Sequence, residues 1–98
     1  MKSGSNLESV LENGHFAVTA ELGPPKGTSR RAVERKAETL KNVADAVNIT
    51  DNQTAITRMS SLAACIMVRQ LGLDPVMQIT CRDRNRLAIQ ADVLGASA

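Results

Sequence analysis

A short apolar run that changes abruptly to polar residues, and then to a helical pattern, occurs three times along this chain. The clearest copy is Pro75–Gln90, where the apolar run Val76–Ile79 is interrupted only by Gln78 and is followed by the mostly polar and charged residues Thr80–Arg86. An apolar run entered through a proline is typical of a strand that is buried on both faces. Helical patterns between such runs, in units of about 30 residues, predict parallel strands joined by crossover helices.

The first unit is predicted from the same features. Phe16–Leu22 predicts a strand that ends at a turn rich in glycine and proline, and Thr28 or Ser29 can cap the helix that follows. Arg30 and Glu34 are spaced to pair on the charged, water-facing side of this helix. The opposite side carries the apolar positions Val33, Ala37, Leu40 and Ala44.

The second and third units complete the predicted elements. Ala46–Thr50 predicts the second strand, and a helix follows at residues 57–71, where Gly72 ends it. The last helix begins after Asp83 or Asn85, either of which can cap it. The apolar positions expected on these two helices are Met59, Leu62, Ala63, Ile66 and Met67 on the first, and Leu87, Ala91 and Leu94 on the second.

These elements predict a single α/β domain over residues 1–98. Residues 1–15 hold a lead-in helix at Asn6–Asn13, and residues 16–98 hold three parallel β-α units. A chain of 98 residues can bury one modest core. Phe16 is its only aromatic residue, although aromatic side chains normally supply much of a core's buried area. The composition therefore indicates a fragment of a larger fold.

Composition also argues against several classes of protein. The 12 basic and 10 acidic residues are spread evenly, so we expect no nucleic-acid partner. No run approaches the roughly 18 apolar residues of a membrane span, and no apolar export segment follows the first residues, so we expect a cytoplasmic protein without membrane contact. Cys65, Cys81 and His15 lack partners at ligand spacing, so we expect free thiols, a surface histidine and no metal site.

Polar residues follow each predicted strand at its carboxyl end. Because the carboxyl ends of parallel strands meet at one edge of a sheet, we expect these residues to form a single site. They are Glu21 after the first strand, Thr50, Asp51 and Asn52 after the second, and Gln78, Thr80, Cys81 and Arg82 after the third.

Glu21 is the strongest catalytic candidate in this set. A carboxylate within an apolar strand is costly to bury in its ionised form, and burial favours the protonated form that a general acid needs. Alternatively, the carboxylate lies at the end of the strand and meets solvent or Lys26. The residues alone leave both interpretations open.

The loop residues carry weaker signals. Thr50–Gln53 could hydrogen-bond a ligand, but turns between strands and helices are rich in such residues. Arg82, Arg84 and Arg86 could contact a phosphate at a helix N-terminus, or could be solvated charges. No glycine-rich phosphate loop is present, which argues against a Rossmann or P-loop protein.

Four blocks in this order resemble the methylenetetrahydrofolate reductase family: Ala20–Gly27, Asp45–Gln53, Arg58–Ala63 and Pro75–Arg86. The resemblance runs from about Phe16 to the C-terminus. It implies a TIM (β/α)8 barrel that carries FAD and reduces 5,10-methylenetetrahydrofolate to 5-methyltetrahydrofolate. The electron donor would be NAD(P)H or a partner redox subunit.

The resemblance also implies roles for single residues. Glu21 matches the acidic residue that protonates the folate and opens its imidazolidine ring, and Thr50 matches a threonine that contacts the flavin. Gln78 stands where many members have a flavin-contacting histidine, and Thr80 and Cys81 match the end of the family's third strand. The candidate cofactor-binding residues are therefore Thr50, Asp51, Asn52, Gln78, Thr80, Cys81 and Arg82.

The chain supplies three of the barrel's eight β-α units, so we expect an N-terminal piece of the enzyme. Unpaired edges on the first and third strands favour an oligomer or contact with the rest of a barrel. Two other functions stay open: a non-catalytic folate- or flavin-binding subunit, and a small flavodoxin-like nucleotide-binding domain, which would show a doubly wound helix arrangement.

Overall fold

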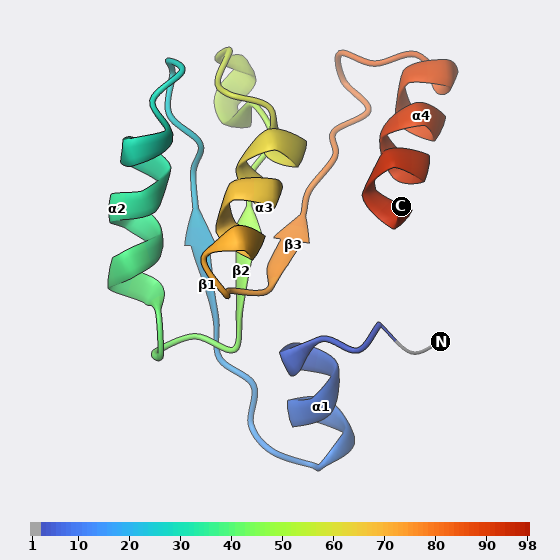
Figure 1. The fold of residues 1–98 in the computed structure, drawn as a ribbon. Helices are drawn as coiled ribbons and strands as arrows, with labels where there is room; N and C mark the ends of the chain where they lie inside the picture. Colours follow the sequence, from blue (N-terminus) through green and yellow to red (C-terminus); the bar gives the residue numbers. More distant parts are fainter. Residues whose placement is uncertain (1–2) are drawn as a thin grey trace.

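The computed structural model describes residues 3–98 as an open parallel sheet of three strands with helices on one face (Figure 1). The strands lie in the order β1-β2-β3, and each pairs in parallel with the strand next to it in sequence. The elements are α1 (Asn6–Glu12), β1 (Thr19–Leu22), α2 (Arg30–Leu40), β2 (Ala46–Ile49), the 3₁₀ turn η1 (Gln53–Ala55), α3 (Ser61–Gln70), β3 (Pro75–Met77) and α4 (Arg86–Ser97).

The sequential strand order is that of β-α units in a barrel. The helices α2 and α3 contact each other, and both pack on the sheet, α2 on β1 and α3 on β2 and β3. A flavodoxin-like domain would instead reverse its strand order and place helices on both faces. The described residues therefore confirm the parallel β-α units and argue against the doubly wound alternative.

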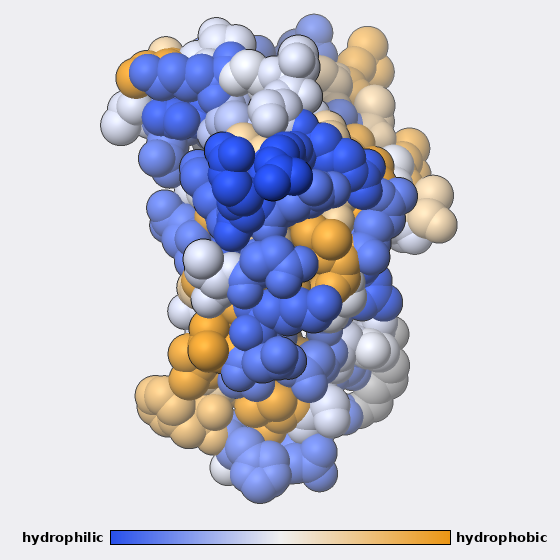
Figure 2. Space-filling model, turned by 60° about the vertical axis from the view of Figure 1, so that its left-hand side comes forward, coloured by the Kyte–Doolittle hydropathy of each residue, from blue (hydrophilic) through white to orange (hydrophobic). Residues whose placement is uncertain are grey.

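The core lies between the sheet and these two helices. Leu22, Val47 and Ile49 from the strands and Val33 and Val68 from the helices are each at most 1% exposed. Alternate strand residues point to opposite faces, and the face away from α2 and α3 is uncovered at Glu21 and Val76, whereas Ala46 at the start of β2 is buried there. The outer side of α2 is hydrophilic (Figure 2), and the expected Arg30–Glu34 pair is present there at 3.0 Å.

The first strand is shorter than predicted. It begins at Thr19, whereas Phe16 lies outside the sheet with 90% of its surface exposed. Thr19 pairs with Ala46, the first residue of β2, so the residues before Thr19 have no strand beside them. The N–H of Val18 donates instead to the side chain of Asp45, at 2.8 Å.

The third helix also differs from the prediction. It begins at Ser61, because the Ser60 side chain caps it by accepting from the N–H of Ala63 at 3.2 Å. Its buried residues are Ser61, Ala64, Cys65 and Val68. Of the expected apolar positions, Met59 and Met67 pack against the core, whereas Ile66 is 53% exposed, so the expected face was right only in part. The caps proposed for the other helices are confirmed, with Ser29 on α2 and Asn85 on α4.

The last helix packs little against the remainder of the structure. None of its residues is buried, and the predicted apolar positions Leu87 and Leu94 are 70% and 72% exposed. Within residues 3–98, no helix combines the length and the apolar character that crossing a membrane requires.

We expect this chain to associate in solution. Within the described sheet, β1 and β3 each have one unpaired edge, and apolar side chains of α4 face water. Association is favourable because it can pair the strand edges and bury the apolar side chains of α4. Light scattering should give a mass above the 10.5 kDa of one chain. Leu94→Lys should lower that mass, whereas Thr39→Lys, which adds the same charge to an exposed position on α2, should not. A monodisperse monomer that unfolds cooperatively would contradict this expectation.

Candidate functional site

The three loops that leave the carboxyl ends of the strands meet at one edge of the sheet, which is uppermost in Figure 1. Hydrogen bonds join them: the N–H of Met59 donates to the carbonyl of Pro25 at 2.8 Å, and the N–H of Thr80 donates to Asp51 at 2.8 Å. The convergence of the three strand ends is therefore confirmed. This edge is the candidate site.

Glu21 lies on the uncovered face of the sheet. Leu22 beside it is 1% exposed and points to the helices, whereas Glu21 is exposed, because adjacent strand residues point to opposite faces. Of the two interpretations left open for Glu21, the structure therefore agrees with a carboxylate at the strand end that meets solvent, and not with a buried one. The carboxylate faces the open side, where a ligand can reach it.

Asn48 is a site residue that the sequence reasoning missed. It lies on β2 and is the register partner of Glu21 on β1 and of Val76 on β3, so these residues form one row across the open face. Its side-chain N–H₂ donates to the carbonyl of Ala20 at 3.3 Å. The available signal was a single polar residue in the otherwise apolar strand Ala46–Ile49.

Thr50 lies at the end of β2, one residue beyond the last strand pair. It is 5% exposed, and its hydroxyl has no hydrogen-bond partner among the described residues. Gly23 is directly beside it, since a Cβ built on Gly23 would lie 3.6 Å from the Thr50 Oγ1. A buried hydroxyl without a partner is uncommon and marks this position as a candidate ligand contact.

Asp51 forms a buried ion pair with Arg84. Its side chain is 0% exposed, and both guanidinium nitrogens of Arg84 donate to it, the Nη2–Oδ1 bond measuring 3.0 Å. The hydrogen bond from Arg84 lowers the pKa of Asp51, against the effect of burial, and the N–H of Thr80 lowers this pKa further. Arg84 also lies 3.2 Å from a carboxylate oxygen of Asp92 on α4.

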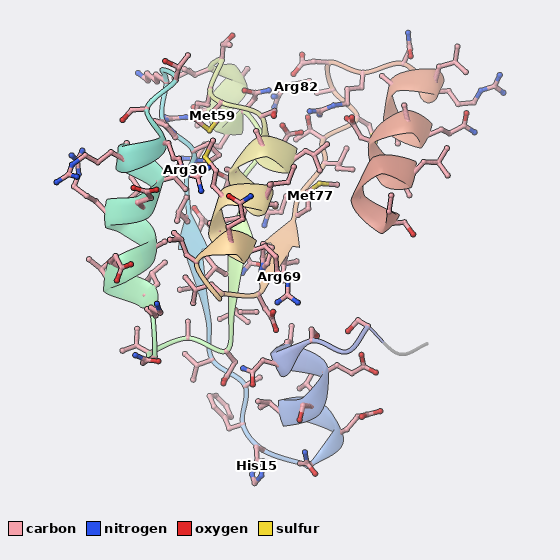
Figure 3. The ribbon with its side chains drawn as sticks, in the orientation of Figure 1. His15, Arg30, Met59, Arg69, Met77 and Arg82 are labelled. Atoms are coloured by element: carbon pink, nitrogen blue, oxygen red, sulfur yellow. The ribbon has the colours of Figure 1, made fainter. Side chains whose placement is uncertain are left out.

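Asn52 and Arg82 join the second and third loops. Asn52 has a left-handed backbone, with φ of 45°, and its side-chain oxygen accepts from the N–H of Arg58 at 2.8 Å. The guanidinium of Arg82 donates to the carbonyl of Asn52 at 3.0 Å and pairs with Asp83 at 2.8 Å. Figure 3 shows Arg82 beside the loop that follows β2.

The remaining predicted residues lie along the exit from β3. Gln78 is exposed, its N–H donates to the carbonyl of Ile49 at 3.2 Å, and its carbonyl accepts from the Ser61 hydroxyl at 2.8 Å. Both cysteines are free, as expected. Cys81 is exposed at the site edge, whereas burial raises the pKa of the Cys65 thiol to about 11.

A metal site is not formed within residues 3–98, where no group of three or more His, Cys, Asp or Glu side chains could hold an ion. His15 is exposed after α1, at the opposite end of the molecule from the site edge (Figure 3). The side chains at the site edge supply a carboxyl group, amides, hydroxyls, the Cys81 thiol and arginines.

Comparison with known proteins gives one result. A family model described as methylenetetrahydrofolate reductase matches residues 6–98 of this chain. No curated protein and no solved structure gives a significant match. The match covers the whole described sheet and every candidate residue at its carboxyl edge.

We expect the Asp51–Arg84 pair to make stability depend on pH in the acid range. Because the folded pKa of Asp51 lies below the usual value of about 3.9, the stabilisation is fully present above that value and is lost as the pH falls through the folded pKa. Asp51→Asn should cost about 3 kcal/mol at pH 7 and progressively less as the pH falls below about 4.

Denaturant unfolding at a series of pH values measures this difference. The matched control is Asp83→Asn, which removes a carboxylate from an ion pair whose side chains are 42% and 58% exposed, and it should cost at most about 1 kcal/mol. Equal losses in the two variants, or a loss in Asp51→Asn that persists unchanged to pH 2, would contradict the assignment.

Proposed function

Since this chain belongs to the methylenetetrahydrofolate reductase family, we propose that it supplies part of the site that reduces 5,10-methylenetetrahydrofolate to 5-methyltetrahydrofolate with a flavin. The observation that carries the proposal is the position of Glu21. Its carboxyl group stands on the open face of the sheet, in one row with Asn48 and next to the edge formed by the polar loops.

The residues at this edge suit a flavin ring, whose rim carries both hydrogen-bond donors and acceptors. Thr50 offers a hydroxyl that has no partner among the described residues, and Gly23 leaves the space beside it unfilled by a side chain. Gln78 is exposed at the same edge and brings an amide that can both donate and accept. We propose that Thr50 and Gln78, together with Asn52, Thr80, Cys81 and Arg82 around them, hold FAD. When bound, FAD supplies the hydride.

Glu21 carries the proton in this proposal. In its protonated form, the carboxyl group donates to a nitrogen of the folate's five-membered ring, and the adjacent carbon–nitrogen bond breaks. The methylene carbon left behind is electron-poor and accepts hydride. Asn48 is placed to hydrogen-bond the same part of the substrate, because its side chain shares the row with Glu21.

The three strand ends do not identify the source of the electrons. NAD(P)H or a partner redox subunit would have to reach the flavin from the open face, because α2 and α3 cover the other. A non-catalytic folate- or flavin-binding subunit would use the same edge. It differs in one respect, since it would not need the carboxyl group of Glu21.

We expect Glu21→Gln, in flavin-loaded enzyme, to abolish folate reduction while the electron donor still reduces the flavin. Glutamine keeps the size and the hydrogen-bonding ability of the side chain but cannot donate a proton as an acid, and losing a general acid typically costs about 10²–10⁴-fold in rate. Anaerobic stopped-flow absorbance of the flavin measures both half-reactions.

Glu38→Gln is the matched control, because Glu38 is an exposed glutamate on α2, and it should leave both half-reactions unchanged. Full folate reduction in Glu21→Gln would remove Glu21 from the mechanism. Flavin binding without any folate reduction in the unaltered protein would favour the non-catalytic subunit.

We also expect the 98-residue chain, without further polypeptide, to retain FAD poorly. Its three strand ends can contact the ring, but contacts to the phosphates and adenosine would have to come from elsewhere, and losing them forfeits much of the binding free energy. The absorbance spectrum of the purified chain measures this. One flavin per chain after dialysis would contradict the expectation.

A further inference from the structure

The segment after β3 is held in place by side chains. The last backbone bond of the ladder runs from the N–H of Gln78 to the carbonyl of Ile49, and the Ser61 hydroxyl holds the carbonyl of Gln78. Beyond this point, side chains hydrogen-bond both the backbone N–H and the backbone carbonyl of Thr80. Its N–H donates to Asp51 Oδ2 at 2.8 Å, and its carbonyl accepts from Arg84 Nη1 at 3.0 Å.

The two residues that hydrogen-bond Thr80, Asp51 and Arg84, also form an ion pair with each other. Asp51 is 0% exposed and Arg84 is 17% exposed, so water competes little for their contacts. Asp92 of α4 faces Arg84 from the other side, and Arg82 and Asp83 in the same loop pair with each other at 2.8 Å. The cluster thus links the loop after β2, the loop after β3 and α4.

We propose that Asp51 and Arg84 are positioning residues that clamp the backbone of Thr80 and so fix Gln78–Cys81 at the site edge. The carboxylate of Asp51 is enclosed by protein donors, so this role replaces the direct cofactor contact expected for it. The identity of the ligand that meets Gln78–Cys81 rests on the proposed function, whereas the clamp does not.

A clamp and a general stabilising pair differ in where the structure opens when the pair is broken. Loss of a clamp opens the exit from β3 and leaves the other end of the sheet closed, whereas loss of a general stabiliser opens the whole domain. Two amides distinguish these outcomes: that of Thr80, and that of Val47, which donates to the carbonyl of Asp74 at 2.8 Å at the opposite edge.

Hydrogen–deuterium exchange of the full chain, resolved to single amides by mass spectrometry, tests the proposal without any ligand. Asp51→Asn removes the negative charge and puts an N–H₂ donor against the N–H groups of Arg84, so the paired contact with Arg84 is lost and the remaining oxygen accepts more weakly from the N–H of Thr80. We expect exchange at Thr80 to rise at least about tenfold more than exchange at Val47, because Val47 responds only to the loss of global stability whereas Thr80 also responds to local opening. Arg84→Lys keeps the charge but not the paired donors, so it should give a smaller rise at Thr80.

Asp83→Asn is the control and should leave both amides unchanged. An unchanged Thr80 amide in Asp51→Asn overturns the proposal. So does equal loss of protection at Thr80 and Val47, including the case in which Asp51→Asn unfolds the chain, because the pair would then stabilise the whole fold.

The visible spectrum of flavin-loaded enzyme provides a second measurement. Asp51→Asn should shift the visible flavin spectrum, Arg84→Lys should shift it less, and Glu38→Gln on α2 should leave it unchanged. If the chain together with the rest of its barrel binds no flavin, the proposed function fails, and the exchange result still decides the clamp. If Thr80 opens but the spectrum stays unchanged, the clamp exists but does not position the site, and that outcome overturns its positioning role.

Discussion

The burial of β2 is the constraint on which the rest of this structure depends. Val47 and Ile49 are fully buried because β2 has a strand on each side and helices over one face. Helices on that face alone leave the opposite face to Glu21, Asn48 and Val76. The hydrophobic core and the candidate site are therefore two sides of the same strands, and the pleat of the sheet divides the residues between them.

The polar edge is held together by hydrogen bonds from side chains and not by backbone hydrogen bonds between strands. The backbone hydrogen bonds between strands end within a residue of Ile49 and Met77. Beyond them, side chains hydrogen-bond the backbone of the loops, as Asp51 and Arg84 do for Thr80 and as Asn52 does for Arg58. Such contacts join loops that are distant in sequence. They give an irregular segment a defined position, which a site made of loops requires.

Much of the fold follows from the sequence, because its signals are local. The three strands, the caps at Ser29 and Asn85 and the meeting of the strand ends all depend on residues that are close together along the chain. The exposure of Glu21 and the buried face of α3 depend on which side of each element is covered, and a single strand or helix does not carry that information. The Asp51–Arg84 pair joins positions 33 residues apart, so no spacing rule identifies it. The family match to residues 6–98 agrees with the four sequence blocks that indicated it.

The sequential order of the strands has a consequence for how the chain folds. Each strand pairs with the one before it, α2 packs on β1, and α3 packs on β2 and β3, so each pairing needs only one β-α unit. Each pairing must first close a loop that spans a whole helix, 27 residues from Thr19 to its partner Ala46, and the entropy lost in that closure makes parallel pairing slower than the formation of local contacts. A growing polypeptide can add these units one at a time as it leaves the ribosome, each new strand using the edge of the previous one as its template.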